Sequence, residues 1–115
     1  PSYLQALHTV DAHVASLIKA IQSRPEYLAE NWLVIISTDH GGRGRKHRGG
    51  HDISEIFTTF LIVSGSSSIQ GEIKEPSYIV DVPVTALTHL GVPVDAAWQL
   101  DGKAVGIRQE FLNDH

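Results

Sequence analysis

The chain has 115 residues, of which 42% are hydrophobic and 19% are charged, and its formal net charge at pH 7 is −4. This length suits one modest domain, the negative charge argues against a general nucleic-acid binder, and the absence of cysteine excludes disulfides and thiolate metal ligands. No apolar run approaches the roughly 20 residues that span a bilayer, and nothing in the composition indicates a cellular compartment.

Residues 2–24 predict an amphipathic helix. Apolar side chains recur about every 3.5 residues, which places them in one stripe on a helix: Leu4, Leu7, Val10, Val14, Leu17 and Ile21. We expect this stripe to pack on a sheet, with Pro25 ending the helix and residues 26–30 adding a short helical turn. His13 and Asp11 are two residues apart and point in different directions, which favours a solvent-facing or structural role.

Residues 32–36 form a continuous apolar, β-branched run that predicts a buried strand covered on both faces. Directly after it stand Asp39, His40 and two glycines, which allow a sharp turn. Open α/β sheets bind ligands at the carboxyl ends of their strands. A carboxylate and an imidazole together suit zinc or manganese, so Asp39 and His40 are candidate metal ligands.

Residues 41–52 form a long loop with five glycines and four cationic side chains. The loop also carries His47, His51 and Asp52, so several nitrogen and oxygen donors follow one strand, which favours a metal site. The cations could hold an anionic substrate or could merely keep a glycine-rich loop soluble, and these alternatives stay open: Arg43, Arg45, Lys46 and Arg48.

A second buried strand is predicted at residues 58–65, followed by a polar turn. A further helix is predicted from Asp81, a suitable N-cap, with Pro83 in its first turn and Gly91 as its stop signal. Its apolar stripe consists of Val84, Leu87 and Leu90.

These segments together resemble the alkaline phosphatase superfamily, in its sulfatase-like and type I phosphodiesterase/nucleotide pyrophosphatase branches. The run from Asp39 to Gly50 is similar to the family signature DHGG-x-G-x-x-H-GG. The helix around residues 10–17, the strand at residues 58–65, and the elements at residues 80–92 and 98–103 resemble the family's neighbouring segments. The likeness extends from Tyr3 to Val105 and implies an α/β fold whose mixed sheet is flanked by helices.

The resemblance implies a metal-dependent hydrolase of phosphate mono- or diesters, or of sulfate esters. In that family two divalent ions, usually zinc, flank a serine or threonine nucleophile. Asp39 and His40 match ligands of the ion that activates the nucleophile, and either His47 or His51 matches a ligand of the second, with His47 favoured. The nucleophile and the other ligands lie upstream of the matching segments. We therefore expect residues 1–115 to be one C-terminal segment of a larger catalytic domain and to be inactive alone.

Other functions compete with this one. The main alternative is a noncatalytic metal- or anion-binding module. Nucleic-acid binding is the poorest, because no aromatic residue stands between the loop cations to stack on bases. We also expect exposed apolar sheet surface where the upstream part of the protein would pack, and such a surface favours self-association.

Overall fold

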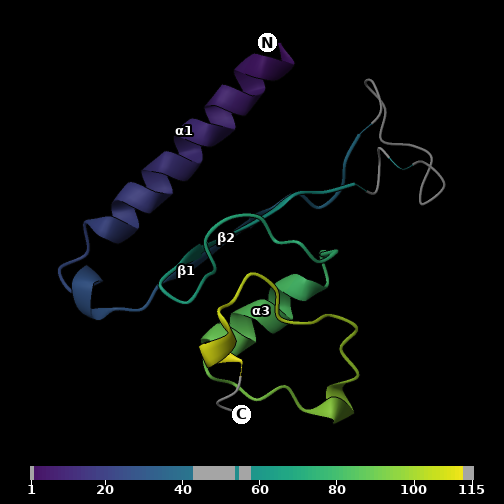
Figure 1. Cartoon of the computed structure of the whole chain (residues 1–115). Coiled ribbons are helices and arrows are strands. Elements are labelled where there is room, and N and C mark those ends of the chain that lie inside the picture. The colour runs from purple at the N-terminus through teal and green to yellow at the C-terminus, as the bar shows by residue number, and fades with distance from the viewer. Residues whose placement is uncertain (1, 43–53, 55–57, 113–115) are drawn as a thin grey trace. The chain divides into compact units, whose positions relative to one another are not determined.

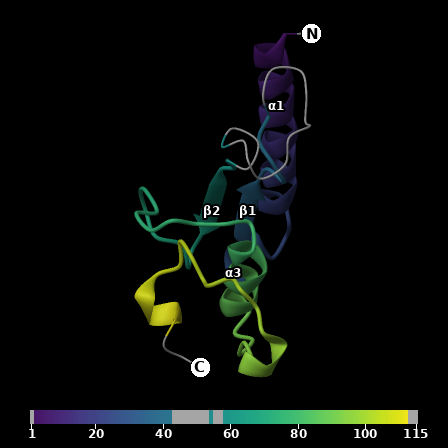
Figure 2. The same cartoon turned by 90° about the vertical axis from the view of Figure 1, so that its right-hand side faces the viewer.

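The computed structural model describes residues 2–42, 54 and 58–112, which fold into two compact units, Pro1–Asn31 and Trp32–His115 (Figures 1 and 2). Within the described residues the structure is a small mixed α/β fold with two α-helices and one two-stranded antiparallel sheet. None of the described helices is long and apolar enough to cross a membrane.

The first unit contains helix α1 (Tyr3–Gln22) and the 3₁₀-turn η1 (Tyr27–Ala29), which confirms the helix and the turn predicted there. A capping box starts α1: the Ser2 hydroxyl accepts from the Gln5 amide at 3.2 Å, and the Gln5 side chain accepts from the Ser2 amide. After α1, Arg24 donates two hydrogen bonds to Glu30, at 2.7 and 2.6 Å. This bidentate pair raises the pKa of Arg24, first through the hydrogen bonds and then through charge attraction.

The second unit begins with strands β1 (Leu33–Ser37) and β2 (Leu61–Gly65), which pair in antiparallel register from Leu33 opposite Gly65 to Ser37 opposite Leu61. Glycine is required at position 65, because a Cβ atom there would lie 2.2 Å from the Trp32 carbonyl oxygen. Both strands were predicted, although β2 starts three residues later than expected.

The prediction that both strands are buried is wrong. Every residue of β1 is only half-buried, and β2 alternates half-buried Leu61 and Val63 with exposed Ile62. This alternation is typical of a strand with one covered face. The apolar run correctly predicted a strand, but how many layers cover a strand depends on packing that the run does not specify.

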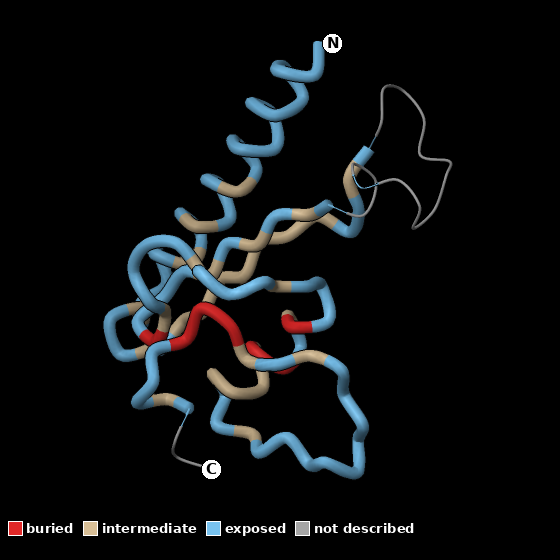
Figure 3. Tube along the Cα trace, turned by 45° about the vertical axis from the view of Figure 1, so that its right-hand side comes forward, coloured by how far each residue is buried: buried red, intermediate tan, exposed pale blue. Residues whose placement is uncertain are grey.

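Helix α3 (Asp81–His89) packs against β1, and its inner face meets the chain segment that follows residue 102. The buried side chains gather here, as the red parts of the tube in Figure 3 show. Three are apolar and three are polar: Val84, Val105 and Ile107, and Ser67, Asp81 and Thr85. The core of this unit is therefore small and unusually polar.

The predicted ends of α3 are half right. Gly91 stops the helix as expected: with φ of 69° it lets the Val92 amide reach the Leu87 carbonyl and its own amide reach the Thr88 carbonyl. Asp81, however, is not the N-cap, because Val80 occupies that position and the Asp81 carboxylate bonds elsewhere.

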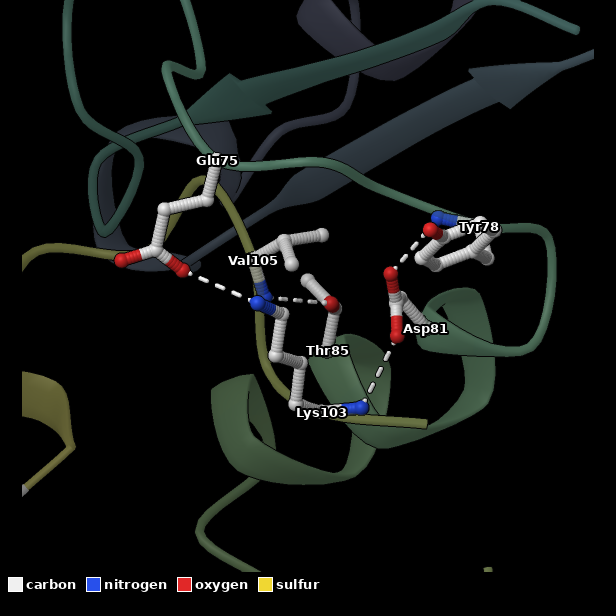
Figure 4. A network of polar contacts seen from close by, with 6 residues as sticks. All are labelled: Glu75, Tyr78, Asp81, Thr85, Lys103 and Val105. Carbon is white, nitrogen blue, oxygen red and sulfur yellow. Dashed lines mark hydrogen bonds and ion pairs between the residues drawn. The ribbon is translucent and has the colours of Figure 1, made fainter. Parts of the chain in front are cut away.

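The buried Asp81 carboxylate joins two other segments to α3 (Figure 4). One oxygen accepts from the Tyr78 amide at 2.7 Å and the other from the Lys103 amide at 2.9 Å. One turn along the helix, the Thr85 hydroxyl accepts from the Val105 amide at 3.0 Å. At the surface Glu75 holds the Lys103 ammonium at 3.0 Å, which raises the pKa of Lys103 through a hydrogen bond and through charge.

Candidate metal centre

Asp39 and His40 lie just beyond the carboxyl end of β1, where the sequence pattern predicted them. Because the sheet is antiparallel, this end lies beside the amino end of β2, where Ser37 faces Leu61. Both side chains are accessible: the Asp39 side chain is 88% exposed and that of His40 is 46% exposed. A strand end thus presents a carboxylate and an imidazole to solvent.

The His40 ring is held by backbone oxygen next to it. Its Nδ1 atom lies 2.6 Å from the Gly41 carbonyl oxygen. A carbonyl can only accept, so Nδ1 must carry the proton and donate. In the neutral ring this leaves the lone pair on Nε2, and such a backbone contact is the usual way in which a metal-binding histidine is oriented.

The Nε2 atom of His40 lies 3.6 Å from an Asp39 carboxylate oxygen, and the other Asp39 oxygen accepts from the His40 amide at 2.9 Å. Two ligands of one tetrahedral zinc ion lie about 3.4 Å apart, given bonds of about 2.0–2.1 Å. The donor types and their separation therefore fit two positions of a zinc or manganese site. The same separation also suits a solvent-exposed ion pair with a protonated imidazole, which contributes little stability.

The remaining predicted site residues lie outside the described residues. They are the candidate second-ion ligands His47 and His51 and the candidate anion-binding residues Arg43, Arg45 and Lys46, together with Arg48. Within residues 2–42, 54 and 58–112, no three histidine or acidic side chains come together as a metal site requires. Asp39 and His40 thus supply two of the three or more protein ligands that zinc usually takes.

Two further chain segments reach the same end of the sheet. Ser37 of β1, residues 59–61 and residues 77–79 line one small cavity of about 10 Å³. Large side chains are exposed around it, including Phe60, Tyr78 and Ile79. The sequence analysis did not select these residues, because the proximity of residue 78 to residue 37 follows from the packing of α3. An unexplained aromatic directly before each of two predicted elements was the available signal.

The described residues also contain a serine and histidine pair, which could be mistaken for a nucleophile and its base. The Ser67 hydroxyl lies 2.7 Å from His89 Nδ1, but Ser67 is completely buried. A nucleophile must reach substrate, so this contact instead fastens the turn after β2 to the last turn of α3. Sequence reasoning gave no reason to pair the two.

Comparisons of the chain with protein-family models, with curated proteins and with solved structures gave no match.

Proposed function

We propose that this chain is the metal-ligand-bearing C-terminal part of a metal-dependent hydrolase that acts on phosphate mono- or diesters or on sulfate esters. The observation that supports the proposal most directly is the Asp39 and His40 pair at the end of β1, with Nδ1 of His40 bonded to the Gly41 carbonyl. The signature resemblance around these residues, to the alkaline phosphatase superfamily, supports the same chemistry.

In this proposal Asp39 and His40 hold one of two divalent ions, zinc or manganese. Such an ion, when bound, stabilises negative charge that develops on the ester oxygens. Asp39 contributes an anionic oxygen, and His40 contributes Nε2 in an orientation maintained by the Gly41 carbonyl. His47 or His51 would serve the second ion, and Arg43, Arg45 and Lys46 would attract the substrate anion.

A noncatalytic metal-binding module is the second candidate. It is favoured by the donor count, since two described donors can bind an ion without assembling the rest of a reaction centre. The two proposals differ in stoichiometry and turnover. A hydrolase of this kind should hold two ions per chain and consume an ester, whereas a module should hold one ion and consume nothing.

The test is the metal content of the intact protein by mass spectrometry, together with hydrolysis of an aryl phosphate, an aryl phosphodiester and an aryl sulfate. We expect two equivalents of zinc or manganese and turnover of one ester class in the wild-type protein. Asp39→Asn and His40→Ala should each abolish turnover while the melting temperature stays within a few degrees, because both side chains are accessible.

Asp101→Asn and His8→Ala are matched controls, since both change an exposed residue of the same type at a distance in sequence from the candidate site. They should keep metal and activity. Wild-type activity in the double variant Asp39→Asn, His40→Ala would exclude the hydrolase proposal. One bound ion without turnover of any of the three esters would favour the module instead.

A further inference from the structure

The end of the sheet that carries Asp39 and His40 also exposes two aromatic rings. Phe60 directly precedes β2 and is 50% exposed, and Tyr78 lies three residues before α3 and is 63% exposed. Both residues line the small cavity that Ser37 closes from β1. Ser37 is only two residues before Asp39, so the rings lie within one small ligand's length of the candidate metal ligands.

Tyr78 is fixed at its backbone although its side chain is exposed. The buried Asp81 carboxylate accepts from the Tyr78 amide at 2.7 Å, and the Tyr78 carbonyl accepts from the Asp81 amide at 2.9 Å. In Figure 4 Tyr78 lies toward the end of the sheet to which the β1 arrow points. A charged, desolvated acceptor makes strong hydrogen bonds, so the residue is well positioned before any ligand arrives.

The surface around these rings is apolar with a polar margin. Ile79 adds exposed apolar area, and hydroxyl groups stand beside it on Ser37, Thr59 and Ser77. The cavity itself has room for about one water molecule. A ligand would therefore lie across the exposed rings rather than enter the cavity. Flat aromatic groups bind such surfaces by stacking or by edge-to-face contact.

We propose that Phe60 and Tyr78 form a platform for the aromatic group of an ester whose anionic group is held at Asp39 and His40. This inference rests on the proposed function and adds the substrate class, which is an aryl or heteroaryl ester rather than a small alkyl ester. Phe60 and Tyr78 determine specificity in this scheme and take no part in bond breaking. Asp81 is a positioning residue, since it acts on the ligand only through Tyr78.

The experiment compares the binding of phenylphosphonate and methylphosphonate to the intact zinc-loaded protein by isothermal titration calorimetry. Both carry the same anionic group, and neither can be hydrolysed at its carbon–phosphorus bond by an esterase. We expect the wild-type protein to prefer the phenyl compound. Phe60→Ala and Tyr78→Leu should each reduce that preference roughly 2- to 10-fold, while methylphosphonate binding and zinc content stay unchanged.

Two controls identify the rings as the cause. Tyr78→Phe keeps the ring and the backbone bond to Asp81, so it should keep the preference. Trp98→Ala removes an aromatic side chain of similar exposure beyond the other end of α3 and should also change nothing. Equal affinity of the wild-type protein for the two phosphonates, or an unchanged preference in the double variant Phe60→Ala, Tyr78→Leu, would overturn the inference.

The outcomes separate this inference from the proposed function. If the protein hydrolyses esters and binds two metal ions but shows no phenyl preference, the hydrolase proposal stands and the platform is refuted. If the protein prefers phenylphosphonate but turns over no ester, the platform stands as a binding surface and the hydrolase proposal fails.

Discussion

Single buried polar residues hold the second unit together. Asp81 and Thr85 are almost completely buried, and their oxygens accept from the amides of Tyr78, Lys103 and Val105. These amides belong to segments without regular ladder partners, so side chains provide the hydrogen bonds that a sheet would otherwise supply. Each such residue replaces part of the apolar core that this small unit lacks.

Removing the Asp81 carboxylate should therefore be costly. Asp81→Ala leaves two amides without their acceptor, and we expect the free energy of unfolding to fall by about 2–4 kcal/mol. Urea denaturation followed by circular dichroism measures this change. Asp101→Ala, at an exposed neighbouring position, should change stability by no more than about 0.5 kcal/mol. Similar losses in the two variants would contradict the structural role of Asp81.

Gly102 is the second residue on which this joint depends. A Cβ atom at this position would lie 1.9 Å from the Val80 carbonyl oxygen and 3.0 Å from the Asp81 amide nitrogen. Both are backbone atoms, so no side-chain rotation can relieve the clash. We expect Gly102→Ala to lower the free energy of unfolding by about 3 kcal/mol in the same urea experiment. An unchanged midpoint would mean that the two segments do not approach so closely in solution.

The elements themselves were largely predictable, because their signals are local. The stripe from Leu4 to Ile21, the break at Pro25 and the stop at Gly91 each lie within one element, and α1, η1 and the end of α3 follow them. What the local pattern did not contain was the partner of each element. The burial of the strands and the true role of Asp81 both depend on segments some 20 residues or more away, and those predictions were wrong.

The end of α3 provides a test at the same level. Gly91 has φ of 69°, a left-handed conformation that costs most residues about 1–2 kcal/mol and costs asparagine less. Gly91→Ala should lower the free energy of unfolding by about 1 kcal/mol, and Gly91→Asn should fall between this variant and the wild type. Thermal denaturation of the three proteins gives the order. Equal stability of all three would show that α3 ends differently.

At the level of the whole chain, the candidate site was predictable only in part, and for the same physical reason. Asp39 and His40 follow one strand directly, so an apolar run and two adjacent residues were enough to place them. Tyr78 reaches the site through the packing of α3 on β1, which no single segment encodes. The predicted roles of His47, His51 and the loop cations stay predictions, since these residues lie outside the described part of the chain.

The chain also exposes much apolar surface, as expected for a protein that self-associates or packs against further polypeptide. In the first unit no residue of α1 is buried, and Tyr3, Leu4, Val10 and Leu17 are each more than half exposed. In the second unit Ile62 on β2 and Leu90 after α3 are exposed as well. Helices gain most of their stability from tertiary packing of an apolar face, so the stripe on α1 needs a partner surface.

A synthetic peptide of residues 1–31 tests that need. It keeps the capping box of Ser2 and Gln5 and the ion pair of Arg24 with Glu30, but it contains β-branched residues that lower helix propensity. We expect low helicity by circular dichroism at micromolar concentration, rising with concentration as apolar stripes associate. High helicity independent of concentration would contradict this expectation, because local capping and propensity alone would then suffice to form α1 and its exposed stripe would require no partner.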